Sequence, residues 1–251
     1  MRRILLTCTL AFTLLPVFGG EGKAPPMDKE KSLLIDYVDP FIGTTNFGTT
    51  NPGAVCPNGM MSVVPFNVMG SADNTYDKDA RWWSTPYEHT NCFFTGYSHV
   101  NLSGVGCPEL GSLLLMPTTG ELNVDYKEYG SKYKDEQASP GYYSNYLTKY
   151  NIKTEVSATP RTGIARFTFP KGESHILLNL GEGLTNESGA MLRRVSDSEI
   201  EGMKLLGTFC YNPQAVFPIY FEQSSRHNRI LEKATSDDRC GSRMGSRPRQ
   251  I

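Results

Sequence analysis

The sequence predicts an all-β protein, an antiparallel β-sandwich, and three observations support this fold class. The apolar runs are short and rich in β-branched and aromatic residues, as strands are. Turn residues separate these runs, since the 251 residues include 24 glycines and 16 prolines. No window carries a sustained helical stripe of apolar residues. The expected strands are 61–66, 92–97, 113–116, 142–147, 152–157, 164–169, 176–180 and 216–221.

Two of these runs show the alternation of a strand that buries one face. Residues 152–156 and 164–169 alternate between apolar and polar side chains, and Pro160 and Gly163 lie between them. Successive runs follow at intervals of about 8–12 residues, which is typical of antiparallel sandwiches. We therefore expect residues 35–221 to fold as one domain.

The N-terminus has the layout of a secretory signal peptide. Arg2 and Arg3 precede the apolar run 4–18, and two glycines follow it. This run is shorter than the roughly 20 apolar residues that a membrane helix needs, so no membrane span is expected. We assign residues 1–20 to the signal peptide and residues 21–34 to a polar leader. The protein is thus expected to be exported, to the periplasm, the cell surface or the medium.

The C-terminal residues 222–251 have almost no aliphatic pattern and cannot form a core. We expect either a disordered tail or the out-of-frame end of a shortened chain. A basic arm for nucleic acid is the disfavoured alternative, because Glu232, Asp237 and Asp238 dilute the positive charge. The whole chain has a formal net charge of −1, which gives no field that would attract nucleic acid.

Export implies an oxidising compartment in which cysteines can pair. Five cysteines remain after the signal peptide, so at least one stays unpaired, and the sequence does not determine which ones pair. We expect one disulfide at most, with the other cysteines buried as small apolar residues. No Cys-x-x-Cys spacing supports a structural zinc site. The five are Cys56, Cys92, Cys107, Cys210 and Cys240.

The candidate ligand-binding residues are Trp82, Trp83, His99 and Asn101. The tryptophans lie among polar residues, a combination that suits a sugar ring, although a tryptophan is more often a packing residue. His99 and Asn101 belong to the glycine-rich stretch 96–111, which we interpret as a loop at a site. The His99 imidazole either binds hydroxyl groups or braces the turn.

Other chemistry finds little support in the sequence. A serine hydrolase is rejected because no Gly-x-Ser-x-Gly motif occurs. Residues 36–44 have no phosphate-binding spacing, so nucleotide binding is not supported. Asp36 and Asp39 could form a carboxylate pair, but solvated or capping carboxylates are the default expectation.

Several motifs occur in order along the chain, namely Val38-Asp-Pro-Phe-Ile-Gly43, Asn51-Pro-Gly-Ala54, Trp83-Ser-Thr-Pro-Tyr87, Gly96-Tyr-Ser-His99, Leu102-Ser-Gly-Val-Gly-Cys107, residues 110–117 and Ala138-Ser-Pro-Gly-Tyr-Tyr143. Their order is that found in glycoside hydrolase family 92, and residues 35–221 resemble the N-terminal β-sandwich domain of that family. The resemblance implies a supersandwich-like fold and an exported bacterial exo-α-mannosidase. Family members act mostly on α-1,2 linkages of mannan or N-glycans, and they invert the anomeric carbon with the help of calcium.

The resemblance also implies that catalysis and substrate contact are divided between two domains. In the family, a glutamate general acid and an aspartate base lie in a larger C-terminal helical barrel, and we expect most calcium ligands there too. No catalytic residue is therefore expected in this chain, which alone would be catalytically incomplete. Its expected partners are that barrel domain and mannose-containing glycans, contacted by Trp82, Trp83, His99 and Asn101. Many relatives have a histidine where this chain has Asn101, which bears on fine specificity.

Two functions remain in competition at this point. The first is the substrate-contacting domain of an exported α-mannosidase. The second is a stand-alone carbohydrate-binding module that uses the same loops without catalysis. A sandwich with a purely structural role is a third class.

Overall fold

The computed structural model describes residues 33–45, 48–76, 84–102, 104, 106–107, 109–184, 187–207, 210, 212 and 214–225. The chain divides into two units, Met1–Leu33 and Leu34–Ile251, and the elements below all belong to the second. The expected signal peptide 1–20, most of the polar leader and residues 226–251 lie outside the described residues.

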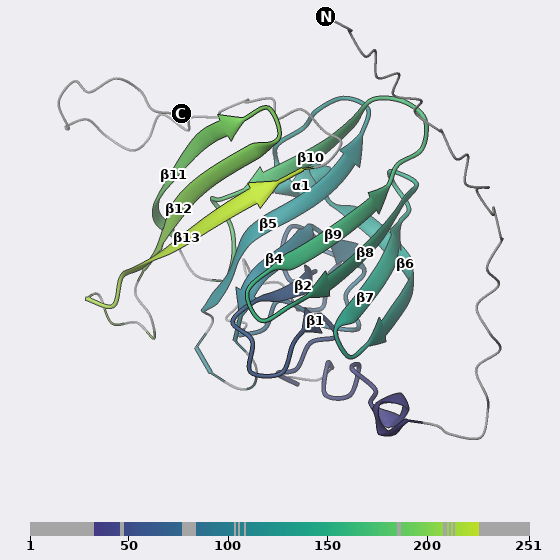
Figure 1. Ribbon diagram of the computed structural model, residues 1–251. Coiled ribbons are helices and arrows are strands. Elements are labelled where there is room, and N and C mark those ends of the chain that lie inside the picture. Colours follow the sequence, from purple (N-terminus) through teal and green to yellow (C-terminus); the bar gives the residue numbers. More distant parts are fainter. Residues whose placement is uncertain are drawn as a thin grey trace, which may run out of the picture. The chain divides into compact units, whose positions relative to one another are not determined.

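The described residues form three antiparallel sheets (Figure 1). The first sheet has the order β1-β2-β4-β5-β10, with bounds Ala54–Val55, Ser62–Phe66, Gly96–Asn101, Leu110–Thr119 and Ser174–Asn179. The second has the order β3-β6-β7-β8-β9, with bounds Phe93–Phe94, Ser131–Ser139, Tyr142–Leu147, Ile152–Ala158 and Gly163–Thr168. The third has the order β11-β12-β13, with bounds Glu187–Ser196, Glu199–Leu206 and Phe217–Ser224.

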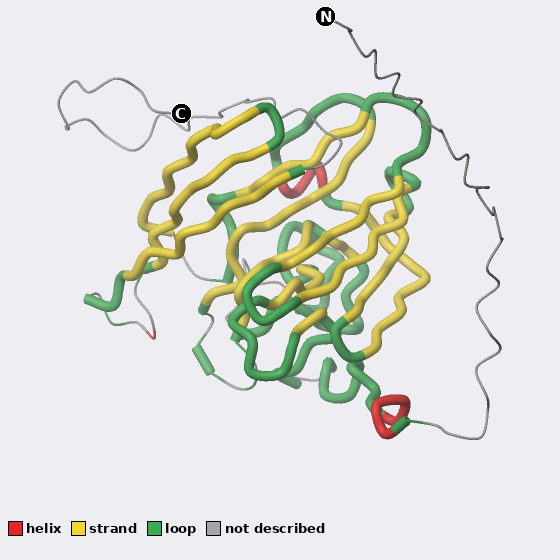
Figure 2. Tube along the Cα trace, viewed as in Figure 1, coloured by secondary structure: helices red, strands yellow, loops and turns green. Residues whose placement is uncertain are grey.

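Helix is limited to two short segments within the described residues (Figure 2). One is the 3-10 helix η1, Leu34–Tyr37, and the other is α1, Tyr126–Tyr129. Asp125 caps α1, because its side chain accepts a hydrogen bond from the backbone N–H of Lys127. None of the helices in the described residues has the length and apolar character needed to span a bilayer.

The main core lies between the first and second sheets, which confirms the predicted β-sandwich. Strand β8 shows how the layers form: Ile152, Thr154 and Val156 are buried, while the residues between them face the other side. The buried residues of this core are Ala54, Val63, Phe94, Tyr97, Met116, Tyr129, Tyr143, Leu147, Tyr150, Ile152 and Val156. Burial of these side chains supplies the hydrophobic free energy that holds the two sheets together.

Most of the expected strands are present, but the run 92–97 is divided between β3 and β4, and β5 extends beyond the expected 113–116 at both ends. Strand β7 has the predicted bounds, and β13 extends to Ser224, beyond the expected domain end at residue 221. Strands β1, β6, β11 and β12 were not expected from the sequence. Strand β6 is rich in charged residues because one of its faces is open to solvent, so the run carries no apolar signal.

The third sheet is joined to the first by hydrogen bonds and a disulfide. The backbone N–H of Leu184 donates to the carbonyl oxygen of Leu110 at 3.2 Å, just before β11 begins. Cys107, between β4 and β5, is disulfide-bonded to Cys210, between β12 and β13. Of the other described cysteines, Cys56 is half-buried and Cys92 is exposed, and both are free. The expectation that the unpaired cysteines are buried is therefore wrong for Cys92.

Candidate functional site

The glycine-rich stretch 96–111 is only partly a loop. Its first half, Gly96–Asn101, is strand β4, and the loop proper begins at residue 102 and ends where β5 starts at Leu110. The expectation of one continuous loop was wrong because Gly96 packs inside the sheet. A Cβ atom there would lie 3.1 Å from the carbonyl oxygen of Leu115, so this glycine permits close strand contact.

His99 lies on β4 and is held by the neighbouring strand. Its Nδ1 lies 2.7 Å from the carbonyl oxygen of Leu113 on β5. A β-bulge brings this oxygen into reach: the β4–β5 register shifts between Tyr97 and His99, and Leu113 adopts a φ of 57°. A left-handed conformation is unfavourable for leucine, so the surrounding sheet must enforce it.

The environment of His99 defines its protonation state. Burial lowers the pKa of its imidazole below the ordinary value of 6.5, so the ring is neutral at pH 7. A carbonyl oxygen can only accept, so Nδ1 carries the proton and donates to Leu113, which leaves Nε2 as an acceptor. His99 therefore braces two strands.

Asn101, the second candidate on β4, has its side-chain amide engaged within the protein. Its Nδ2 donates to the hydroxyl oxygen of Ser62 at 3.1 Å and to the carbonyl oxygen of Ser98 at 3.3 Å. Its Oδ1 accepts from the Ser98 hydroxyl at 2.9 Å. This arrangement fits a residue that fixes the start of the loop, because the amide is already hydrogen-bonded within the fold.

Trp82 and Trp83 lie outside the described residues, so the prediction that one ring faces a ligand remains a prediction. The chain that follows them is firmly anchored. Asn67 accepts a hydrogen bond from the Glu88 backbone N–H at 2.8 Å and donates its Nδ2 to the Glu88 carbonyl oxygen at 2.8 Å. Tyr87 is fully buried. The tryptophan segment therefore leads into a fixed point of the domain.

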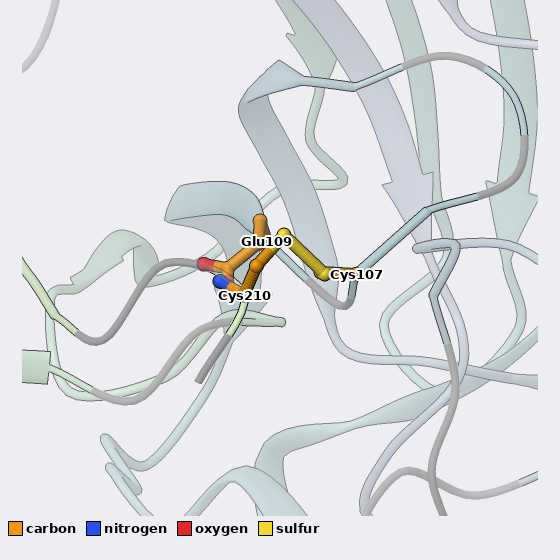
Figure 3. Close-up of a disulfide and its surroundings, with 3 residues drawn as sticks. All are labelled: Cys107, Glu109 and Cys210. Atoms are coloured by element: carbon orange, nitrogen blue, oxygen red, sulfur yellow. A yellow bond between two sulfur atoms is a disulfide. The ribbon is translucent and has the colours of Figure 1, made fainter. Parts of the chain in front are cut away.

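The loop between β4 and β5 is tied to the β12–β13 connection at two points. The Cys107–Cys210 disulfide joins them across 103 residues of sequence. Figure 3 shows Glu109 beside Cys210, and its Oε1 accepts from the Cys210 backbone N–H at 2.6 Å. The sequence left the cysteine pairing open, and nothing in its spacing singled out Glu109.

The described residues do not fit a calcium site. Among them, no group of three or more His, Cys, Asp or Glu side chains could hold a metal ion. Two buried carboxylate oxygens, Oε2 of Glu88 and Oε2 of Glu109, lack hydrogen-bond partners. They have different neighbours, since the other oxygen of Glu88 bonds to Thr90 and that of Glu109 to Cys210. Calcium needs six to eight converging oxygen ligands.

Asp39, one of the two acidic residues near the start of the domain, has a local role. Its Oδ1 accepts a hydrogen bond from the backbone N–H of Phe41 at 2.9 Å, which is a turn-stabilising contact. The default expectation of a capping carboxylate is confirmed for this residue.

Comparison with known proteins identifies the family. Residues 37–245 match the model of the glycosyl hydrolase family 92 N-terminal domain. The chain belongs to glycoside hydrolase family 92. The resemblance seen in the sequence motifs is thus confirmed, and the match continues past the expected domain end at residue 221.

Solved members of family 92 share the fold. A family 92 α-mannosidase from Bacteroides thetaiotaomicron is 32% identical, with a TM-score of 0.65 over 75% of this chain and 25% of that chain. It has also been solved in complex with mannoimidazole. A second glycosyl hydrolase of the family is 27% identical, with a TM-score of 0.59 over 74% of this chain and 25% of that chain.

A secreted glycosidase from Arthroderma benhamiae, itself uncharacterised, is 30% identical over 149 residues. The matched region is 55% of this chain and 17% of that protein. The chain thus spans about a quarter of the length of the solved relatives and less of this one.

Proposed function

We propose that this chain is the N-terminal, substrate-contacting domain of an exported exo-α-mannosidase. The observation that carries the proposal is the match of residues 37–245 to the family 92 N-terminal domain. An α-mannosidase among the solved relatives supports mannose-containing glycans as the substrate class. In line with the family that the sequence resembles, we propose inversion at the anomeric carbon and a preference for α-1,2 linkages of mannan or N-glycans.

In this proposal the catalytic carboxylates belong to the C-terminal helical barrel. An inverting glycosidase needs a general acid and a general base about 6.5–9.5 Å apart, with a water molecule between the base and the sugar. Of the buried carboxylates described here, Glu88 and Glu109 are bound within the fold. We therefore propose that the chain alone does not hydrolyse mannosides.

The proposed role of this chain is to bind and orient the sugar. A ring of Trp82 or Trp83 would stack on the apolar face of mannose, and the anchored chain at Tyr87 would limit the freedom of that ring. His99 and Asn101 would mainly hold the adjacent loop in place, because both side chains bond within the β4 region. A bound calcium ion would bind and polarise sugar hydroxyls, and we propose that the barrel holds it.

Export is proposed from the N-terminal motif. The run 4–18 has the features of a signal peptide, and the Arthroderma benhamiae relative is named as secreted. The Cys107–Cys210 disulfide also requires an oxidising compartment.

The test joins residues 21–225 to the helical barrel of a family member and measures mannoside turnover. Replacing the contacting tryptophan with alanine should lower kcat/KM by about tenfold or more and change the melting temperature little, since stacking acts on the substrate. Both Trp82→Ala and Trp83→Ala are needed, because neighbouring residues in extended chain face opposite sides. Tyr220→Ala, at a 73% exposed ring on the third sheet, is the matched control.

Two results would contradict the proposal. One is unchanged kcat/KM in both tryptophan variants, which would make these rings packing residues. The other is calcium-dependent hydrolysis of an aryl α-mannoside by the unmodified chain, because the proposal assigns it no catalytic carboxylates.

A further inference from the structure

The carboxylate of Glu136, on strand β6, points to the inner face of its sheet because of a β-bulge. The β6–β7 register shifts between Lys134 and Gln137, where Asp135 adopts a φ of 54°. The extra residue reverses the alternation of β6, so that Glu136 follows Tyr133 to the inner face. Without the bulge, Glu136 would point to the outer face with Lys134. Bulges of this kind are common beside binding sites because they redirect single side chains.

Two phenols fix one oxygen of the Glu136 carboxylate. The hydroxyls of Tyr87 and Tyr143 donate to Oε1 at 2.8 and 2.6 Å. Both tyrosines are fully buried, and burial raises the pKa of each phenol well above its ordinary value of 10. The two phenols therefore remain protonated donors, and they hold the carboxylate in one orientation.

The other oxygen of Glu136 is unused. Within the part of the chain that the structure describes, Oε2 has no hydrogen-bond partner, and it is not among the buried atoms that lack one. Since Glu136 is half-buried, Oε2 reaches solvent while Oε1 is locked. A preoriented acceptor of this kind loses little entropy when it binds a donor.

His89 lies next to this carboxylate through Tyr87. Its Nδ1 is 2.9 Å from the Tyr87 hydroxyl oxygen. The single Tyr87 proton is donated to Glu136, so Nδ1 must carry a proton and donate to Tyr87. The other ring nitrogen, Nε2, lies on an exposed side chain and accepts a hydrogen bond when it carries no proton.

An aromatic ring borders the same place. The Phe41 ring centroid is 5.2 Å from that of His89, with the planes tilted by 59°. The backbone holds the two together, because the His89 N–H donates to the carbonyl oxygen of Thr44 at 2.9 Å, three residues after Phe41. Glu136, His89 and Phe41 are thus linked by a chain of contacts that runs through Tyr87 and the His89 ring.

We propose that Glu136 and His89 form a sugar-binding site, in which Glu136 Oε2 and His89 Nε2 accept hydrogen bonds from hydroxyls of a hexopyranose beside Phe41. Acceptors call for a ligand with donors, and the carboxylate disfavours an anion. The aromatic ring suits the apolar face of a neutral sugar. The inference rests on the proposed function for the choice of mannose as the probe.

The test titrates the full chain with methyl α-D-mannoside and follows saturation-transfer NMR and the His89 ring nitrogen shifts. The key variant is Glu136→Gln, because its amide oxygen can still accept from Tyr87 and Tyr143 while its NH₂ group replaces Oε2. We expect this variant to weaken binding by about tenfold or more with a nearly unchanged melting temperature. Glu173→Gln, at a 75% exposed side chain, is the matched control and should bind like the wild type.

His89→Ala is the second variant and keeps the test decisive if Glu136→Gln lowers stability. We expect it to weaken binding without unfolding, because the His89 side chain is exposed. Wild-type affinity in both variants overturns the inference, and so does an absence of sugar binding by the wild-type chain. Neither result contradicts the proposed function, because that proposal is tested separately by the turnover of the joined enzyme and its tryptophan variants.

Discussion

Removing the Cys107–Cys210 disulfide should destabilise the domain strongly. The bond closes a loop of 103 residues, and the chain-entropy relation assigns about 4.7 kcal/mol to a loop of this length. For a domain of this size, each kcal/mol corresponds to about 2–4 °C, so the double variant Cys107→Ala/Cys210→Ala should melt about 10–20 °C lower. The loss comes mainly from a less constrained unfolded state.

Differential scanning calorimetry of the oxidised protein measures this change. Cys92→Ala is the matched control, because Cys92 is a free and exposed thiol, and it should melt within about 2 °C of the wild type. Mass spectrometry of the oxidised protein should find Cys107 and Cys210 joined. The reasoning fails if the double variant melts like the control, or if the two cysteines carry free thiols after oxidative folding.

Two further predictions concern buried polar groups. The pKa of His99 is lowered by burial, so the unfolded state binds the proton more tightly, and the stability due to neutral His99 should be lost as pH falls below about 6.5. In melts from pH 7.5 to 5, His99→Gln should flatten this decline, and an unchanged slope would contradict the assignment. Tyr97→Phe should lower the free energy of unfolding by about 1–3 kcal/mol, because the buried Tyr97 hydroxyl bonds to Thr154 and Asn145. Urea titration measures this, with Tyr146→Phe, whose hydroxyl bonds in an exposed place, expected to change it far less.

The fold could be predicted from the sequence where strands alternate or carry a short run of apolar and aromatic residues. Strands β7 and β8 were placed almost to the residue because each has a buried face. Strands β6, β11 and β12 escaped prediction because charged residues interrupt or replace their apolar residues. These strands owe their conformation to pairing with neighbours, and such pairing leaves little local signal.

The candidate site was only partly predictable. The sequence predicts His99 and Asn101 as ligand contacts, and the structure places both on β4 with hydrogen bonds inside the protein. The sequence could not indicate this, because the partners Leu113 and Ser62 come from other strands. Glu136 was missed for a related reason: only the bulge at Asp135 turns it inward.

The sequence by itself determined the all-β class, the positions of most strands and the family, because short-range patterns and ordered motifs carry this information. The tertiary structure alone decided that Cys107 pairs with Cys210, that His99 donates from Nδ1, and that Glu136 meets Tyr87 and Tyr143. Each of these contacts depends on strand register. A shift of a single residue moves a side chain to the opposite face of its sheet, and one bulge is enough to produce that shift.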